Sequence, residues 1–171
     1  LAALYQEKDV RGTDRFMRVI YDNLAALHDP AVALLIPAFQ TEGSERALRA
    51  SYLRRLELDA LTTHADGSPV RILEVGVGSG ANISLVRDAL PRGLSVEYWA
   101  MDLSHGMLRQ LRRRVARSPE VVPPDGRLRL VMADAHALPY ADAAFDRVFH
   151  IGGIGGYRDP RAALAEMARV A

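Results

Sequence analysis

Three glycines at alternate positions, directly after an apolar run, constrain the fold of this chain more than any other stretch. The run Val70–Val75 carries the β-branched and apolar residues of a strand buried on both faces, as in a parallel sheet. Gly76, Gly78 and Gly80 then allow a sharp turn and a close approach of a ligand to the backbone. The residues after the turn have helical spacing, so the free N–H groups of a helix N-terminus gather there. We therefore expect a strand, a glycine turn and a helix that bind an anionic or strongly polar ligand.

A regular alternation of strands and helices begins at this stretch and predicts an α/β fold with a doubly wound, mostly parallel sheet. Ligands bind such sheets outside the carboxyl ends of the strands, at the switch point beside the first strand. The expected strands are Val70–Val75, Leu94–Met101, Arg127–Ala133 and Phe145–Ile151, and the expected helices between and after them are Ala81–Leu90, Ser104–Arg117 and Pro160–Val170.

The residues before this unit predict a helical region. Thr13 can cap a helix through about His28. A short apolar helix over 30–36 follows, and Ser44 can cap a longer helix to about Thr63. The apolar residues expected on one face of the first helix are Phe16, Val19, Ile20, Leu24 and Leu27. We therefore divide the chain into a helical lid or cap region, 1–65, and an α/β core, 66–171.

Composition narrows the function classes. The net charge is +1 over 171 residues, so nucleic acid is not an expected partner, whereas a small molecule is. The absence of cysteine excludes disulfides, thiolate metal sites and cysteine nucleophiles. His64, His105 and His136 show no metal-ligand spacing with carboxylates, so no metal is expected.

No run reaches the roughly 18 apolar residues of a membrane span, and no signal peptide is visible, which favours a cytoplasmic protein. Homo-oligomer formation is left open.

The glycine turn alone fits two classes of nucleotide-binding enzyme. Gly76, Gly78 and Ala81 satisfy the dinucleotide pattern G-x-G-x-x-A, so a nicotinamide-dependent oxidoreductase is one alternative. Glu74 argues against it, because a dinucleotide fold normally keeps an apolar residue at that place on the strand. With Glu74 included, the stretch resembles motif I, E/D-x-G-x-G-x-G, of the class I S-adenosylmethionine-dependent methyltransferases.

Further stretches resemble motifs of the same family, in the family's order. Asp102 opens a D-x-S-x-x-M-L stretch that resembles motif II. Ala133 opens A-D-A-x-x-L-P-Y, which resembles the family's G-D-A-x-x-L-P-F with alanine in place of glycine. The stretch Phe145–Gly153 resembles motif IV, and Asp159 opens a match to D-P-x-x-A-L-x-E-x-x-R-V. The resemblance covers about Val70 to the end and is closest to the small-molecule branch that includes the ubiquinone and menaquinone methyltransferases.

This resemblance implies S-adenosylmethionine as the cofactor and methyl transfer to a small organic acceptor by in-line displacement. Asp102, at the end of the second expected strand, would accept both ribose hydroxyls. The alternative that Asp102 only caps the next helix is weakened because Ser104 can be that cap. Asp134 would accept the adenine amino group and the backbone N–H of Ala135 would reach a ring nitrogen, although Asp134 taken alone also suits a turn aspartate.

The sequence gives fewer indications of the residues that would bind the methyl acceptor. His150, near the mouth of the fourth strand, would lie close to the methyl group and could deprotonate or position a phenol. A packed histidine at a strand end is an equal alternative. Tyr21, His28 and Tyr157 would line the acceptor pocket, by analogy with family members whose N-terminal helices form a lid. The full set of expected cofactor-binding residues is Glu74, Gly76, Gly78, Ser79, Gly80, Asn82, Asp102, Leu103, Ser104, Met107, Asp134, Ala135 and His136.

Two departures from the family pattern matter. The fourth strand does not lead into N-P-P-Y or D-P-P-Y, which disfavours methylation of adenine amino groups in nucleic acid. The sequence ends at 169–171, where the family continues with K-P-G-G and further strands. Only strands in the order 3-2-1-4 of the family's seven-stranded sheet are expected, so strand four would be an exposed edge. We therefore expect a longer natural chain or a partner segment over that edge. A degenerate, non-enzymatic family member is the remaining alternative.

Overall fold

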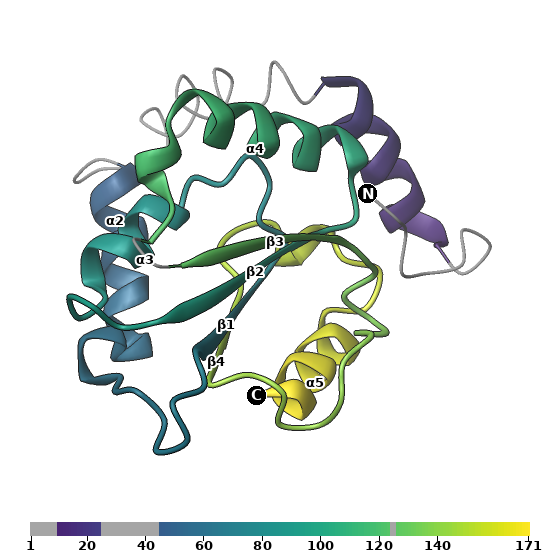
Figure 1. Ribbon diagram of the computed structural model, residues 1–171. Helices are drawn as coiled ribbons and strands as arrows, with labels where there is room; N and C mark the ends of the chain where they lie inside the picture. Colours follow the sequence, from purple (N-terminus) through teal and green to yellow (C-terminus); the bar gives the residue numbers. More distant parts are fainter. Residues whose placement is uncertain (1–9, 25–44, 124–125) are drawn as a thin grey trace.

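The computed structural model describes residues 10–24, 45–123 and 126–171. These residues form a parallel sheet with helices on both faces (Figure 1). The strands are β1 (Val70–Val75), β2 (Val96–Asp102), β3 (Arg127–Met132) and β4 (Arg147–Phe149). The helices are a helix over 12–24, α2 (Glu45–Leu53), α3 (Ile83–Ala89), α4 (His105–Arg117) and α5 (Pro160–Val170). Short 3-10 turns are η2 (Arg54–Leu56), η3 (Leu58–Ala60), η4 (Pro119–Val121) and η5 (Ile154–Gly156).

The strand order is β3-β2-β1-β4, as predicted. β1 pairs in parallel with β2, with Val70 opposite Val96, and with β4 on its other side. The chain therefore builds outward from β1 to β3 and then returns to the opposite side of β1. This reversal creates the switch point where doubly wound sheets bind ligands. The glycine turn follows β1 directly at that point.

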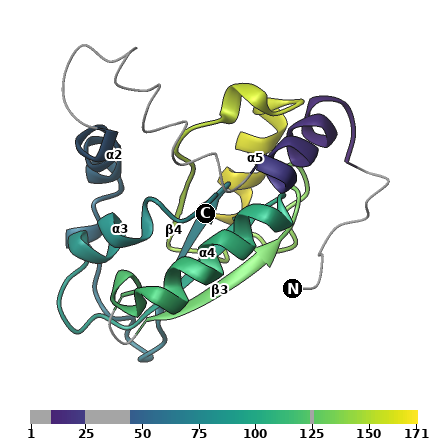
Figure 2. The same cartoon turned by 90° about the horizontal axis from the view of Figure 1, so that it is seen from above.

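Alternate side chains of β1 enter two separate cores, as expected of a strand covered on both faces. Ile72 packs in a core with Leu108 and Leu111 of α4. Leu73 packs in the other core with Met167 of α5. Figures 1 and 2 show α4 lying along the sheet on one side, with α5 on the opposite side.

β4 is much shorter than the predicted strand Phe145–Ile151. It covers only Arg147–Phe149. At its start, the N–H of Phe145 donates to the carbonyl oxygen of Val170, 3.0 Å away, so this residue is bonded to the end of α5. After its end, the chain turns away with a φ of +84° at Gly152. The other predicted strand boundaries differ by at most two residues.

The predicted helix from Ser44 to Thr63 is also too long. α2 ends at Leu53, and the backbone of Glu57 is left-handed with φ +49°. This break turns Leu58 inward, where its side chain is 2% exposed. Burial of that leucine therefore overrides the helical periodicity. The predicted cap, Ser44, lies outside the described residues.

The first helix turns a different face inward than the sequence predicts. Phe16 and Val19, expected on its packed face, are 66% and 51% exposed, and Leu24 is exposed as well. Asp14 is buried instead. Asp14 and Asp22 accept hydrogen bonds from residues of the α/β unit, described below, and these contacts fix this orientation. The predicted extension to His28 and the helix over 30–36 lie outside the described residues, and the division into 1–65 and 66–171 stays a prediction.

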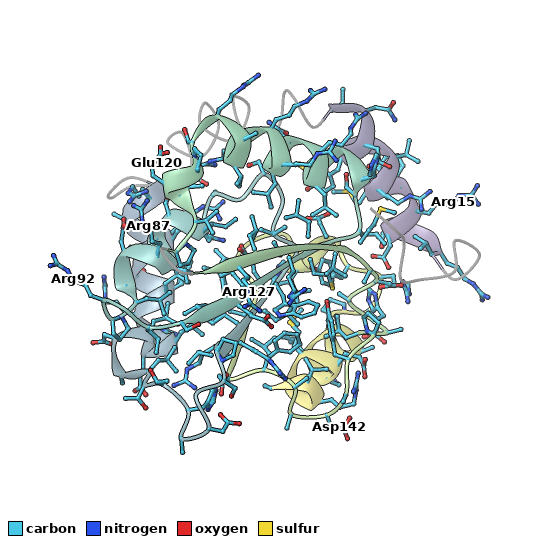
Figure 3. The ribbon with its side chains drawn as sticks, in the orientation of Figure 1. Arg15, Arg87, Arg92, Glu120, Arg127 and Asp142 are labelled. Atoms are coloured by element: carbon cyan, nitrogen blue, oxygen red, sulfur yellow. The ribbon has the colours of Figure 1, made fainter. Side chains whose placement is uncertain are left out.

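The described helices bear on two expectations, the lack of a membrane span and the solvated arginine face of α4. None of the helices in the described ranges combines the length and apolar character needed to cross a membrane. Arg15 and Arg92 project from opposite sides of the molecule in Figure 3. On α4, Leu108 and Leu111 are buried while most of the arginines are exposed, so the arginine-rich side of this helix is a solvated face.

Candidate functional site

A cavity of about 540 Å³ opens where the carboxyl ends of the four strands meet. Its walls come from the glycine turn after β1, the end of β2 and the segments after β3 and β4. Helix 12–24 supplies a further wall, including Met17 and Tyr21. Gly106 of α4 lets this helix approach closely, because a Cβ there would lie 2.7 Å from the Cα of Asp22. The cavity thus lies at the predicted switch point, partly enclosed by the N-terminal region.

The three glycines of the turn have different surroundings, although all have positive φ angles. A Cβ on Gly76 would lie 2.9 Å from Tyr157 Oη, so this position allows no side chain without movement. A Cβ on Gly80 would lie 2.5 Å from Leu111 of α4. Gly80 therefore serves packing and does not line the cavity. Gly78 lines it, and a Cβ there would meet nothing within 4 Å. Gly78 is the glycine that leaves room for a ligand.

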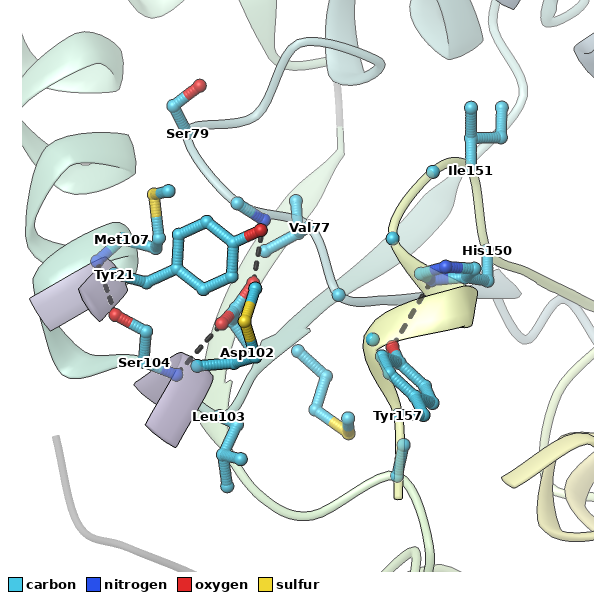
Figure 4. Close-up of a pocket in the computed structure, with 18 of the residues that line it drawn as sticks. Tyr21, Val77, Ser79, Asp102, Leu103, Ser104, Met107, His150, Ile151 and Tyr157 are labelled. Atoms are coloured by element: carbon cyan, nitrogen blue, oxygen red, sulfur yellow. Dashed lines mark hydrogen bonds between the residues drawn. The ribbon is translucent and has the colours of Figure 1, made fainter. Parts of the chain in front are cut away.

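Asp102 ties the glycine turn to the end of β2 (Figure 4). Its Oδ2 accepts a hydrogen bond from the N–H of Gly78, and its Oδ1 accepts one from the N–H of Ser104, both at 2.8 Å. The cap of α4 is Ser104, whose Oγ accepts from the N–H of Met107 at 3.1 Å. Asp22 of helix 12–24 accepts from the Ser104 hydroxyl at 2.7 Å. The structure therefore contains the predicted arrangement, in which Ser104 caps α4 and Asp102 faces the cavity.

Tyr21 lies beside Asp102 in the cavity wall (Figure 4). Burial raises the pKa of the Tyr21 hydroxyl, and the charge of Asp102 raises it further. The phenol therefore stays protonated and can donate a hydrogen bond near the end of β2. Its predicted contact with a methyl acceptor stays a prediction.

Glu74 does not line the cavity but lies behind the glycine turn, where it is 1% exposed. Its Oε1 accepts from the side-chain amide of Asn82 at 2.7 Å, and its Oε2 accepts from the Tyr98 hydroxyl. Arg49 of α2 donates in turn to Asn82 Oδ1 at 3.1 Å. Burial raises the pKa of Glu74 to about 7, against the hydrogen bonds from Tyr98 and Asn82. Glu74 thus supports the turn from inside the core, and its predicted contact with the cofactor stays a prediction.

Replacing Glu74 by glutamine should remove a pH dependence of the folding stability. Folding raises the pKa of this carboxyl from 4.5 to about 7, so the folded state binds the proton more tightly than the unfolded state. The stabilising contribution is full below about pH 4.5 and is lost as the pH rises through 7. The loss amounts to about 3 kcal/mol. Denaturant unfolding between pH 5 and 8 should therefore show the parent losing stability relative to Glu74→Gln. Equal slopes for the parent, Glu74→Gln and the exposed control Glu120→Gln would contradict this role.

Asp134 is a buried carboxylate at the end of β3 that stays charged. Its Oδ1 accepts from the backbone N–H of His136 at 2.9 Å and lies 2.6 Å from His136 Nδ1. Its Oδ2 accepts from Arg158 Nη1 at 2.9 Å. Burial alone would raise the pKa of Asp134, but the hydrogen bonds from His136 and Arg158 outweigh it and hold the pKa below its usual value. The cavity therefore presents a charged acceptor here.

Asp14, Asp134 and His136 each offer an atom within 4.8 Å of the others, a spacing that could also hold a metal ion. Arg158 Nη1 donates to both carboxylates and supplies the positive charge at this place. Arg158 and the two carboxylates therefore form an ion-pair network of protein groups at this place.

His150 is oriented by the backbone of β1. Its Nδ1 lies 2.7 Å from the carbonyl oxygen of Val75, which can only accept, so Nδ1 carries a proton and donates it. Burial lowers the pKa of His150, so the ring is neutral near pH 7 and its Nε2 holds a lone pair. Tyr157 Oη lies 3.3 Å from Nδ1, and a dashed line marks this contact in Figure 4. Burial, together with nearby carboxylates, raises the pKa of Tyr157, so its hydroxyl stays protonated.

The structure brings most of the predicted site residues to one cavity. Glu74 and Gly80 are the exceptions among the predicted cofactor-binding residues, and His28 lies outside the described residues. The predicted residues that line the cavity are Gly76, Gly78, Ser79, Asn82, Asp102, Leu103, Ser104, Met107, Asp134, Ala135, His136, His150, Tyr21 and Tyr157.

Several residues at the site were not foreseen from the sequence. Asp14 and Arg18 line the cavity at helical spacing with the predicted Tyr21, so a polar stripe on the first helix was the available signal. The apolar residues of the same helix pointed to another face. Arg49 also lines the cavity, and Arg158 is bonded to two of its lining residues. Neither has a local sequence pattern that would single it out.

Comparisons with known proteins agree with the fold and with the family that the sequence motifs indicate. A malonyl-[acyl-carrier protein] O-methyltransferase of Halorhodospira halophila is 32% identical over 95% of this chain and 46% of its own length. A demethylmenaquinone methyltransferase of Renibacterium salmoninarum is 38% identical over 68% of this chain and 42% of its own. The chain thus spans about half the length of these curated relatives.

A solved structure shows the same fold at low sequence identity. The magnesium protoporphyrin IX methyltransferase ChlM of Synechocystis, solved with bound S-adenosylmethionine, superposes with a TM-score of 0.63 at 12% identity, covering 95% of this chain and 74% of its own. The methyltransferase domain family matches residues 73–171, more than half of the chain. The resemblance predicted from the sequence motifs is therefore confirmed, and this chain belongs to the methyltransferase domain family.

Proposed function

We propose that the chain binds S-adenosylmethionine and transfers its methyl group to a small organic acceptor. The observation that carries this proposal is the meeting of Asp102, Asp134 and the open face of Gly78 in one cavity at the switch point of the sheet. Membership in the methyltransferase domain family supports it. A cytoplasmic location is part of the same proposal.

The lining residues fit the parts of this cofactor. Asp102 can accept ribose hydroxyls, since a carboxylate accepts up to about four hydrogen bonds. Asp134 can accept from an adenine amino group, and the backbone N–H of Ala135 can donate to a ring nitrogen. The methionine chain would pass Gly78, where a Cβ would meet no neighbour within 4 Å. A cavity of about 540 Å³ is large enough for such a molecule and part of an acceptor.

Catalysis would rest mainly on positioning. Bound S-adenosylmethionine supplies a methyl group on a sulfonium leaving group, so the chain's own residues need only orient the acceptor and manage its proton. His150 is held by Val75 with Nδ1 protonated, which leaves Nε2, a buried atom without a hydrogen-bond partner among the described residues, as the ring nitrogen that would take a proton from an acidic acceptor. Tyr157, protonated and close to His150, can position an acceptor oxygen by donating its hydroxyl hydrogen.

Two measurements test the proposal as a whole. Calorimetric titration with S-adenosylmethionine should show binding, and titration with NADH should not. A nicotinamide enzyme would bind NADH and not S-adenosylmethionine, and Asp134 would have no role in such an enzyme. Mass spectrometry should then detect products about 14 Da heavier among carboxylic-acid and naphthol acceptors, the chemistries suggested by the names of the two relatives. Cofactor binding without any such product across the panel would favour a non-enzymatic member of the family.

His150 should matter for turnover and not for cofactor binding. We expect His150→Gln to lower kcat by about 100-fold, the usual effect of removing a general base. The dissociation constant for S-adenosylmethionine should stay within about twofold, because the imidazole is proposed to act on the acceptor. The control is His105→Gln at an exposed position on α4. If His150→Gln has the same kcat as the parent, this histidine has only a packing role.

A further inference from the structure

Arg158 connects helix 12–24 to the part of the cavity that we propose binds adenine. Its backbone N–H donates to Asp14 Oδ1 at 3.0 Å, and its guanidinium donates to Asp14 Oδ2. The same Nη1 also donates to Asp134 Oδ2 at 2.9 Å. Asp14 belongs to helix 12–24, which Figure 2 shows beside the segment that leads into α5. One guanidinium therefore bridges two carboxylates from distant parts of the chain.

The protonation of His136 follows from its neighbours. The backbone N–H of Asp159 donates to His136 Nε2 at 3.3 Å, so Nε2 carries no proton. Nδ1 then carries the proton and donates to Asp134 Oδ1 at 2.6 Å. Oδ1 thus accepts two hydrogen bonds from His136, whereas Oδ2 accepts one, from Arg158. Among the described groups, Oδ2 is the oxygen of Asp134 with an acceptor position to spare.

The charges in this cluster leave it attractive to a hydrogen-bond donor. Asp14 and Asp134 are 5% and 4% exposed, and Arg158 supplies one positive charge between them. With His136 neutral, the two carboxylates and one guanidinium carry a net charge of about −1. A partly buried negative charge favours a ligand that brings N–H donors over one that brings another acceptor.

We propose that Arg158 is a positioning residue that orients Asp134 so that the site selects a 6-aminopurine over a 6-oxopurine. In this proposal Asp14, on helix 12–24, holds Arg158 in place. The inference rests on the proposed contact between Asp134 and adenine. By holding Oδ2 on one side, Arg158 directs the remaining acceptor position of that oxygen. Because Asp14 shares the same guanidinium, the position of helix 12–24 and selection of the base are linked.

The test compares S-adenosylhomocysteine with S-inosylhomocysteine, in which a carbonyl replaces the amino group of the base. Isothermal titration calorimetry gives the dissociation constant of each, and their ratio measures selection of the base. The parent should favour the adenosyl ligand by at least about 10-fold, because the inosyl carbonyl would face a carboxylate. Asp134→Ala should bring the ratio close to one.

Arg158→Gln should weaken binding of the adenosyl ligand by about 10-fold and reduce the ratio by at least about threefold. Asp14→Asn should shift the ratio in the same direction by a smaller factor. Arg161→Gln, three residues along the chain on the exposed first turn of α5, should leave both constants unchanged. Circular dichroism establishes folding, and if Arg158→Gln does not fold, the ratio in Asp14→Asn decides.

The outcomes separate this inference from the proposed function. An unchanged ratio in Asp134→Ala would remove the adenine contact itself, and the role of Arg158 with it. A collapsed ratio in Asp134→Ala beside a parent-like ratio in Arg158→Gln would keep the adenine contact and overturn the inference alone. Equal weakening of both ligands in Arg158→Gln would likewise overturn it, because a merely structural arginine has no reason to distinguish the two bases.

Discussion

Replacing Gly78 by arginine is expected to abolish binding of S-adenosylmethionine while the chain still folds. Gly78 lines the cavity, and a Cβ there would meet nothing within 4 Å, so the new side chain would occupy the space proposed for the cofactor. Its φ of +56° adds backbone strain of about 1 kcal/mol, which lowers stability without preventing folding. Calorimetry should show an affinity loss of more than about 100-fold, equivalent to at least roughly 3 kcal/mol.

The chain offers a matched control at Gly93, in the loop between α3 and β2. Gly93 has a φ of +78°, and a Cβ there would also meet nothing within 4 Å. It does not line the cavity. Gly93→Arg therefore also places a side chain at a positive φ and adds the same charge, and it should bind S-adenosylmethionine like the parent. If Gly78→Arg is folded by circular dichroism and binds as tightly as Gly93→Arg, the glycine turn is not the cofactor site.

The core of the fold and most of the site could be predicted because they depend on local patterns. The apolar run of β1, the alternating glycines and a carboxylate at the end of β2 each have a direct physical reason within a few residues of sequence. Parallel strands then bring their carboxyl ends together, so Asp102 and Asp134 meet without further information. The predicted strand order, which rested on the resemblance to the methyltransferase family, is also correct.

The errors arise where distant contacts override local periodicity. Apolar residues on helix 12–24 predicted a buried face, but the inward face is chosen by Asp14 and Asp22, whose partners are Arg158 and Ser104. Those partners lie more than eighty residues away in the sequence, and no local pattern links them. β4 is short because Phe145 bonds to the end of α5 instead of extending the strand. Periodicity indicates which face is apolar, but it cannot indicate which polar contacts a helix will make.

Glu74 shows how a correct motif can carry an incomplete interpretation. The acidic residue of motif I was expected at the cofactor, yet its carboxyl lies behind the turn and bonds to Asn82 and Tyr98. A motif records which residue type occurs at a position, whereas burial and partners determine what the side chain does. Tyr98 lies on the neighbouring strand β2, so its contact depends on the β1–β2 register.

Asp102→Ala should reduce the affinity for S-adenosylmethionine by about 3 kcal/mol, or roughly 150-fold. Two charge-assisted hydrogen bonds to ribose would be lost together. The variant would also lose the bond that holds the N–H of Gly78 at 2.8 Å, so the turn itself would be less well placed. Stability should fall by only about 1 kcal/mol, because Ser104 remains as the cap of α4.

Asp159→Ala is the control that separates binding from capping. Asp159 caps α5, and its Oδ1 accepts hydrogen bonds from the N–H groups of Arg161 and Ala162 at 3.1 and 3.0 Å. It thus makes the same kind of backbone contacts as Asp102, but it does not line the cavity. Asp159→Ala should lose stability like Asp102→Ala and keep the parent's affinity. If both variants lose stability equally and neither loses affinity, Asp102 only supports the backbone, and the ribose of the cofactor must be held elsewhere in the cavity.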